Sequence, residues 1–120
     1  MQLYVRAIRG ATTVDEDTRE QVTKRTQELL AVILEANDLE IGDLISVLFT
    51  ATSDIASMFP ATAGRSMGLS GVPLLCAREL DIDGSLPLCI RVMVHAYTPR
   101  AMVDIKHIYL EGATVLREDI

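Results

Sequence analysis

The chain has 120 residues, of which 49% are hydrophobic and only 4% aromatic, and it carries 17 acidic against 11 basic side chains. This length suits a single domain with a substantial core, so we expect residues 1–120 to form one domain. The net charge of −6 argues against nucleic-acid and anionic-membrane partners, because both need a basic surface. The chain has no run of about 18 apolar residues, which a membrane span would need. The N-terminus lacks a signal-peptide layout, so we expect a cytoplasmic protein.

The basic residues are unevenly divided between the two types. Nine of the eleven are arginine, and only Lys24 and Lys106 are lysine. The planar guanidinium group matches a carboxylate and keeps its charge when it is partly buried. The few positive charges of this acidic chain are therefore of the type suited to a carboxylate ligand.

In chain order, the first predicted elements are a strand and a long helix. Residues 3–9 alternate loosely and then meet Gly10, which predicts a strand that ends there. Asp17 or Thr18 suits the N-cap of a helix that runs to about Ala36, with Asn37 as its C-terminal cap. We expect this to be the one long helix.

The rest of the chain predicts four further strands and one short helix. The apolar run 44–51 follows a turn, and Pro60 begins a short helix that Gly68 closes. The remaining predicted segments are strands over 72–79 and 88–96, a turn at 81–84, and a fifth strand with its tail over 106–116.

This element order predicts an α+β fold with a mixed sheet of about five strands. One amphipathic helix covers one face of a sheet, yet the central strands are apolar on both sides. The uncovered face needs a partner, most simply a second copy of the chain. The pattern therefore predicts a homo-oligomer.

Four polar residues in or beside the strands are candidates for a binding site. Arg91 lies within an apolar strand, where it either pairs with a buried carboxylate or binds an anion from a rigid position. Arg9 closes the first predicted strand, where it either lines a cleft or faces solvent. Glu79 closes the third strand, and Tyr109 in the fifth is either packed or in contact with a ligand.

The familiar catalytic sets are missing from the sequence. His95 and His107 have no acidic partner or nucleophile arranged around them, which disfavours a triad. Cys76 and Cys89 have no CxxC spacing, so we expect free thiols and neither a disulfide nor a metal site. No glycine-rich phosphate loop is present. The residues alone leave the function open.

Four segments carry a family resemblance: residues 8–14 (IRGATTV), 59–61 (FPA), 89–93 (CIRVM) and 108–111 (IYLE). Together they resemble the monofunctional chorismate mutases of the Bacillus type, in order and along nearly the whole chain. The resemblance implies a homotrimer with a pseudo-α/β-barrel core and clefts between subunits. Each cleft would convert chorismate to prephenate for phenylalanine and tyrosine biosynthesis, without a cofactor or metal.

The resemblance also implies roles for individual residues. Arg91 matches the arginine that donates to the ether oxygen of the breaking C–O bond. Arg9 and Tyr109 match residues that bind a substrate carboxylate, and Glu79 matches the carboxylate that meets the ring hydroxyl, with Cys76 nearby. The other matching positions are Phe59, Ala61, Arg65 and Leu74 from the adjacent subunit, and Leu116 and Arg117 from the C-terminal tail.

Two positions depart from the pattern of the family. Thr62 stands where lysine is expected, and Leu75 stands where threonine is expected. The first change removes a positive charge from the wall of the cleft. A second substrate carboxylate would then depend on Arg65 or Arg117, or stay solvated. We expect Arg19 and Arg25, by contrast, to lie on the solvated face of the long helix.

Three alternatives remain open from the sequence. A trimeric imine deaminase of the RidA type would also use arginine to hold a carboxylate, but it gives Glu79 no evident purpose beside Arg91. A non-catalytic module that binds carboxylates is disfavoured by the presence of Arg9, Glu79 and Arg91 together. A structural oligomerisation domain would not require charged residues around one cleft.

Overall fold

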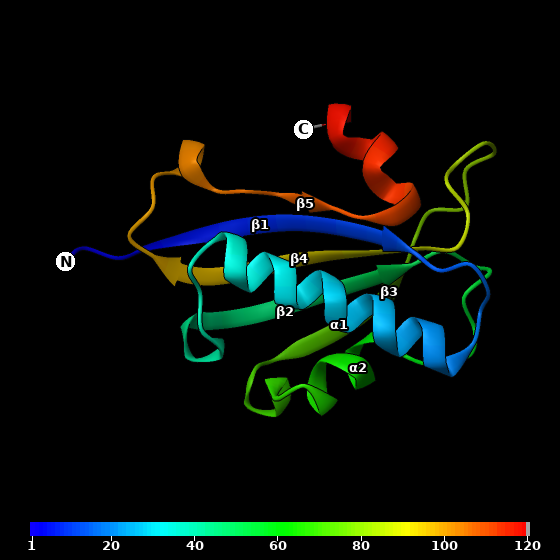
Figure 1. Cartoon of the computed structure of the whole chain (residues 1–120), viewed down its shortest axis with the longest axis horizontal. Helices are drawn as coiled ribbons and strands as arrows, with labels where there is room; N and C mark the ends of the chain where they lie inside the picture. The colour runs from blue at the N-terminus through cyan, green and yellow to red at the C-terminus, as the bar shows by residue number, and fades with distance from the viewer. Residues whose placement is uncertain (120) are drawn as a thin grey trace.

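The computed structural model describes residues 1–119. It contains five strands and two α-helices in the order β-α-β-α-β-β-β, which is the predicted order (Figure 1). Short 3₁₀ segments complete the described chain, and the last of them, η4, spans Glu111–Asp119. The bounds of the main elements are β1 Tyr4–Thr13, α1 Arg19–Ala36, β2 Leu44–Ala51, α2 Pro60–Ser66, β3 Leu74–Arg78, β4 Cys89–Thr98 and β5 Ile108–Tyr109.

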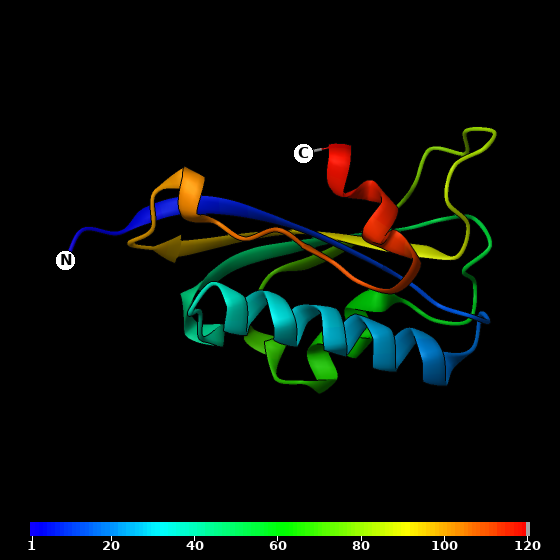
Figure 2. The same ribbon diagram turned by 45° about the horizontal axis from the view of Figure 1, so that its top comes forward.

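The strands form one mixed sheet in the order β3-β2-β4-β1-β5. The central strand β4 is antiparallel to both β1 and β2, whereas the outer pairs β1–β5 and β2–β3 are parallel. Figure 2 shows α1 and α2 on one side of the sheet and η4 on the other. The prediction of an α+β fold with a five-stranded mixed sheet is confirmed.

Helix α1 begins and ends where the sequence predicts. The Thr18 hydroxyl accepts a hydrogen bond from the Gln21 backbone N–H at 3.1 Å, which satisfies one free donor of the first turn. At the other end, the Asn37 side chain donates to the Ile33 carbonyl at 2.9 Å. Both caps fix the length of the helix, and so the stretch of sheet that it covers.

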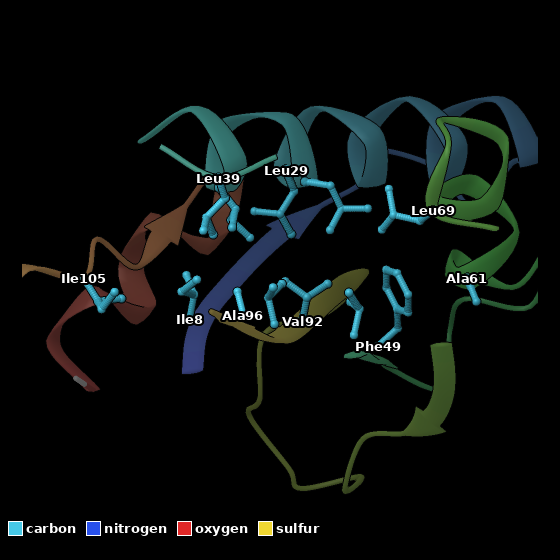
Figure 3. Close-up of a cluster of buried hydrophobic side chains, with 13 residues drawn as sticks. Ile8, Leu29, Leu39, Phe49, Ala61, Leu69, Val92, Ala96 and Ile105 are labelled. Carbon is cyan, nitrogen blue, oxygen red and sulfur yellow. The ribbon is translucent and has the colours of Figure 1, made fainter. Parts of the chain in front are cut away.

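The main core lies between α1 and the sheet (Figure 3). Leu29 and Ile33 from the helix meet Ile8, Phe49 and Val92 from the three inner strands, and all five side chains are buried. Because side chains alternate along a strand, the neighbours of these strand residues point to the opposite face. That opposite face carries the polar candidates from the sequence.

Three predicted boundaries were wrong. Strand β1 does not stop at Gly10 but continues to Thr13, because residues 10–13 stay paired with residues 89–92 of β4. The fifth strand shrinks to residues 108–109, and residues 113–116 belong to η4 instead of a strand. Strand β3 is also shorter than the predicted 72–79. Beside α1, the short helix α2 and the nine-residue η4 are the other substantial helical pieces.

Arg25 contradicts its prediction as a solvated helix residue. Only 14% of its side chain is exposed, and its Nη1 donates to the Thr13 carbonyl at 2.6 Å. The same guanidinium forms ion pairs with Asp15 at 3.1 Å and with Glu111 at 3.3 Å. Arg25 therefore joins α1, the end of β1 and the first residue of η4. Arg19 is exposed, as expected.

The sheet face opposite α1 is covered only in part. Around Tyr109, η4 packs on Ala11 and Cys89 through Ala113 and Leu116. Beyond that cover, apolar side chains stay exposed on this face, at Val5, Leu48, Leu75 and Tyr97. No helix within the described residues is long and apolar enough to cross a membrane.

Gly10 allows α1 to approach the sheet closely, which gives a stability test. A Cβ at this position would lie 2.7 Å from Ile33 Cδ1, 3.1 Å from Leu29 Cδ1 and 3.2 Å from Val92 Cγ2. We expect Gly10→Ala to lower the free energy of unfolding by about 1–3 kcal/mol, because the core must shift to admit the methyl group. Urea unfolding followed by circular dichroism measures this.

Gly42→Ala is the matched control. Nothing lies within 4 Å of a Cβ built on Gly42. The free energy of unfolding of the Gly42→Ala protein should therefore stay within about 0.5 kcal/mol of the value for the unsubstituted protein. A Gly10→Ala protein as stable as this control would contradict the close packing of α1 on β1.

Candidate active site

A cleft of about 250 Å³ opens on the sheet face opposite α1. The strands β1, β2, β4 and β5, the residue that follows β3, and the tail η4 all contribute to it. Its lining includes five residues that the sequence singled out. They are Arg9, Glu79, Arg91, Tyr109 and Leu116, and the other lining residues are Gly10, Leu48, Thr50, Val92 and Met93.

Arg91 and Glu79 form the charged centre of the cleft. Arg91 lies in β4, opposite Thr50 of β2 and Ala11 of β1. Its Nε lies 3.5 Å from Glu79 Oε2. The Thr50 hydroxyl donates a hydrogen bond to the same Glu79 oxygen. Three strands therefore fix the relative positions of one cation and one carboxylate.

The guanidinium of Arg91 is not satisfied by the protein. Its Nε atom is buried and has no hydrogen-bond partner among the described residues, although 42% of the side chain is exposed toward the cleft. A buried N–H without a partner is rare in folded proteins, because its desolvation is uncompensated. The exposed part of the Arg91 side chain is therefore what a ligand in the cleft meets.

Arg9 and Tyr109 line the same cleft from β1 and β5. Arg9 lies within β1 opposite Met93 and is half-buried. It does not end the strand, as the sequence suggested, but it does line the cleft. Tyr109 is buried at 8% exposure in β5, where it pairs with Ala11. Leu116 from η4 closes one side as a half-buried apolar wall.

A second hollow, of about 490 Å³, collects other predicted residues. Phe59, Thr62 and Cys76 line it, together with Arg19 and Arg78. Cys76 is thus not beside Glu79 in the same cleft, because its side chain points to the helix side of β3. The remaining candidates lie elsewhere: Ala61 is buried in the core, Leu74 is half-buried against it, Leu75 is exposed on the opposite face, and Arg65 and Arg117 are exposed.

The cleft has no obvious acid, base or metal ligands beyond Glu79. Burial raises the pKa of the Cys89 thiol to about 11, so this thiol beside Arg91 stays protonated near neutral pH. No group of three or more metal-binding side chains occurs within residues 1–119. Fixed charge and hydrogen bonds are what the cleft offers a ligand.

Comparison with known proteins decides the family. The family model of chorismate mutase type I matches residues 5–120. The chain is 42% identical over 119 residues to chorismate mutase AroH of Bacillus subtilis. This alignment covers 98% of this chain and 94% of that protein. It is 47% identical over 117 residues to chorismate mutase AroH of Thermus thermophilus, with 97% and 96% covered.

The chain belongs to the type I chorismate mutases. A solved structure agrees: a chorismate mutase from Clostridium thermocellum superimposes with a TM-score of 0.89 at 50% identity, and the match covers 91% of this chain and 97% of that one. The resemblance that the sequence carries to this family is therefore confirmed.

Sequence reasoning missed the residues that support the charged pair. Thr50 holds Glu79, and Leu48 and Met93 form apolar walls of the cleft. All three lie on the sheet face of Arg91, as the pairings Thr50–Arg91 and Leu48–Met93 require. Strand alternation could have placed Thr50 and Leu48 on one face, but not opposite Arg91, since the register is set by tertiary pairing.

Proposed function

We propose that this isomerase converts chorismate to prephenate in the cleft around Arg91, without a cofactor. In this rearrangement the ether C–O bond breaks while a C–C bond forms within the same molecule. No proton leaves or enters, and no covalent bond to the protein is made. The chemistry therefore suits a cleft that offers charge and shape instead of an acid and a base.

The observation that carries this proposal is the partly exposed side chain of Arg91, which lies in the cleft beside Glu79. The ether oxygen becomes negative as its bond to carbon stretches, and a donor already in place stabilises that charge more in the transition state than in the substrate. The strand position of Arg91 limits how far its planar guanidinium must reorganise. We assign the ether oxygen to Arg91.

The other residues of the cleft hold the substrate. Arg9 and Tyr109 suit a carboxylate, because one supplies a guanidinium fork and the other a phenolic donor. Glu79 suits the ring hydroxyl as an acceptor, and the Thr50 hydroxyl steadies its carboxylate. Holding a flexible dianion in the compact conformer that reacts lowers the barrier by orientation.

The working site is proposed to form between subunits of a homotrimer. The exposed apolar side chains on the sheet face opposite α1 favour contact with further copies. The cleft around Arg91 and the hollow around Phe59, Thr62 and Cys76 are separate within one chain. In the trimer, one subunit would complete the cleft of the next. The residues that it would contribute are Phe59, Ala61, Thr62, Arg65, Leu74 and Leu75. Cys76 would lie near the ring hydroxyl.

Because Thr62 stands where a lysine is expected, other residues must supply that positive charge. Thr62 is half-buried and cannot supply a cation, whereas Arg65 and Arg117 are exposed. We assign the second substrate carboxylate to these two arginines. Arg117 follows Leu116 in η4, so this tail would close over the bound substrate. Leu75 replaces a hydroxyl by an apolar contact.

The biological setting follows from the reaction. Prephenate formation serves phenylalanine and tyrosine biosynthesis, which we place in the cytoplasm. A RidA-like imine deaminase and a non-catalytic carboxylate-binding module are not favoured, because the matched relatives are chorismate mutases and Glu79 has a use only for a substrate with a hydroxyl.

The test of the proposed function is the loss of chorismate absorbance with purified protein and no added cofactor. We expect the unsubstituted protein to consume chorismate and Arg91→Ala to lower kcat by roughly 10² to 10³, or about 3–4 kcal/mol, because one preorganised donor is lost. Arg91→Lys should also be poor, since a flexible point charge lacks the planar fork.

Lys24→Gln is the control for the loss of one positive charge, because Lys24 is exposed on α1, away from the cleft. Its kcat should match that of the unsubstituted protein. Absence of chorismate consumption would refute the function, and near-normal kcat in folded Arg91→Ala would refute the assignment of the ether oxygen.

The trimer has its own test. Sedimentation equilibrium should give a mass three times the 13.2 kDa of one chain, because the apolar sheet face needs cover.

Mixing Arg91→Ala with an inactive variant of the second hollow, such as Phe59→Asp, should restore activity if each site draws on two subunits. A stable monomer with full activity would contradict this arrangement.

A further inference from the structure

His107 lies directly before β5 and lines neither hollow. Its ring is half-buried. The Nδ1 atom of the ring accepts a hydrogen bond from the backbone N–H of Arg9 at 2.9 Å. The two residues are 98 positions apart, so this contact joins the N-terminal strand to the C-terminal part of the chain.

The contact stands where the pairing of β1 with β5 begins. That pairing contains only Gly10 with Ile108 and Ala11 with Tyr109. Arg9 lies one residue before it, and the imidazole of His107 extends the line of hydrogen bonds by one position. A side chain thus supplies the acceptor for the residue whose guanidinium enters the cleft.

We propose that His107 is a positioning residue, whose Nδ1 fixes the backbone of Arg9 and so sets how Arg9 meets the substrate carboxylate. The same ring stands two residues before Tyr109, which the short β5 places beside Ala11. The bond to Arg9 therefore lies next to both residues assigned to that carboxylate. This inference rests on the proposed function.

The bond requires a neutral ring with its proton on Nε2, because Nδ1 must offer a lone pair. The surroundings favour this form: burial and the positive charge of Arg9 lower the pKa of His107. At the C-cap of α1, the neutral side chain of Asn37 binds the backbone of Lys106 and brings no charge. Lys106, which precedes the ring, is exposed.

The variants His107→Asn and His107→Leu separate the acceptor from the shape of the ring. The amide oxygen of asparagine can occupy the place of Nδ1, whereas leucine fills similar space without an acceptor. We expect His107→Leu to raise KM for chorismate about tenfold with a smaller change in kcat, because Arg9 acts in binding. His107→Asn should stay within about threefold of the unsubstituted KM.

Lys106→Gln serves as the control, since it changes the neighbouring charge but not the bond, and its KM should be unchanged. Should His107→Leu fail to fold, His107→Gln replaces it, because its amide oxygen lies at the reach of Nε2 and not of Nδ1. Equal KM values for the asparagine variant and the variant without a matched acceptor would overturn the proposal.

A measurement without substrate keeps this inference distinct from the proposed function. In the free protein, ¹⁵N NMR should find the His107 proton on Nε2, and the Arg9 amide should exchange with solvent faster in His107→Leu than in His107→Asn. A proton on Nδ1, or equal exchange in both variants, would overturn the positioning role. Failure to consume chorismate with the expected exchange pattern would instead refute the proposed function.

Discussion

The rest of the site depends on one constraint, which is that a guanidinium charge is held in a sheet beside a carboxylate and stays partly exposed to the cleft. Arg91 is tied to β4, and its Nε lies 3.5 Å from the Glu79 carboxylate, which the Thr50 hydroxyl also contacts. The buried Nε makes this ion pair without a hydrogen bond, while 42% of the Arg91 side chain stays exposed. The exposed part of the side chain lies in the cleft, where it can meet a ligand oxygen with growing negative charge.

The fold serves that constraint by giving the sheet two different faces. On one face α1 packs closely, because Gly10 has no side chain to hold Ile33 and Leu29 away. This packing makes β1 and β4 rigid where they carry Arg9 and Arg91 on the other face. Near the cleft, η4 covers only part of that second face, and Arg25 anchors the start of η4 to α1 and β1. The rigid side thus supports the charges, and the open side admits ligands.

Much of this arrangement could be predicted from local sequence, and the failures have a common cause. The caps at Thr18 and Asn37 and the polar residues in apolar strands are local signals, so α1, Arg9, Glu79 and Arg91 were all found. The continuation of β1 past Gly10, the burial of Arg25 and the support of Glu79 by Thr50 depend on which strands pair and in which register. Those long-range pairings override local propensity. The distribution of the other candidates over a second hollow likewise depends on long-range packing within the fold.

The central claim is that fixed charge and orientation, with no proton transfer, carry the reaction. The most direct test compares kcat for chorismate in H₂O and in D₂O at matched acidity. The account predicts a ratio of about one, because no bond to an exchangeable proton breaks or forms as the ether C–O bond stretches. A kcat ratio of about two or more, retained when the viscosity of the H₂O sample is matched to that of D₂O, would show that a proton is transferred in the rate-limiting step. That result would contradict the account.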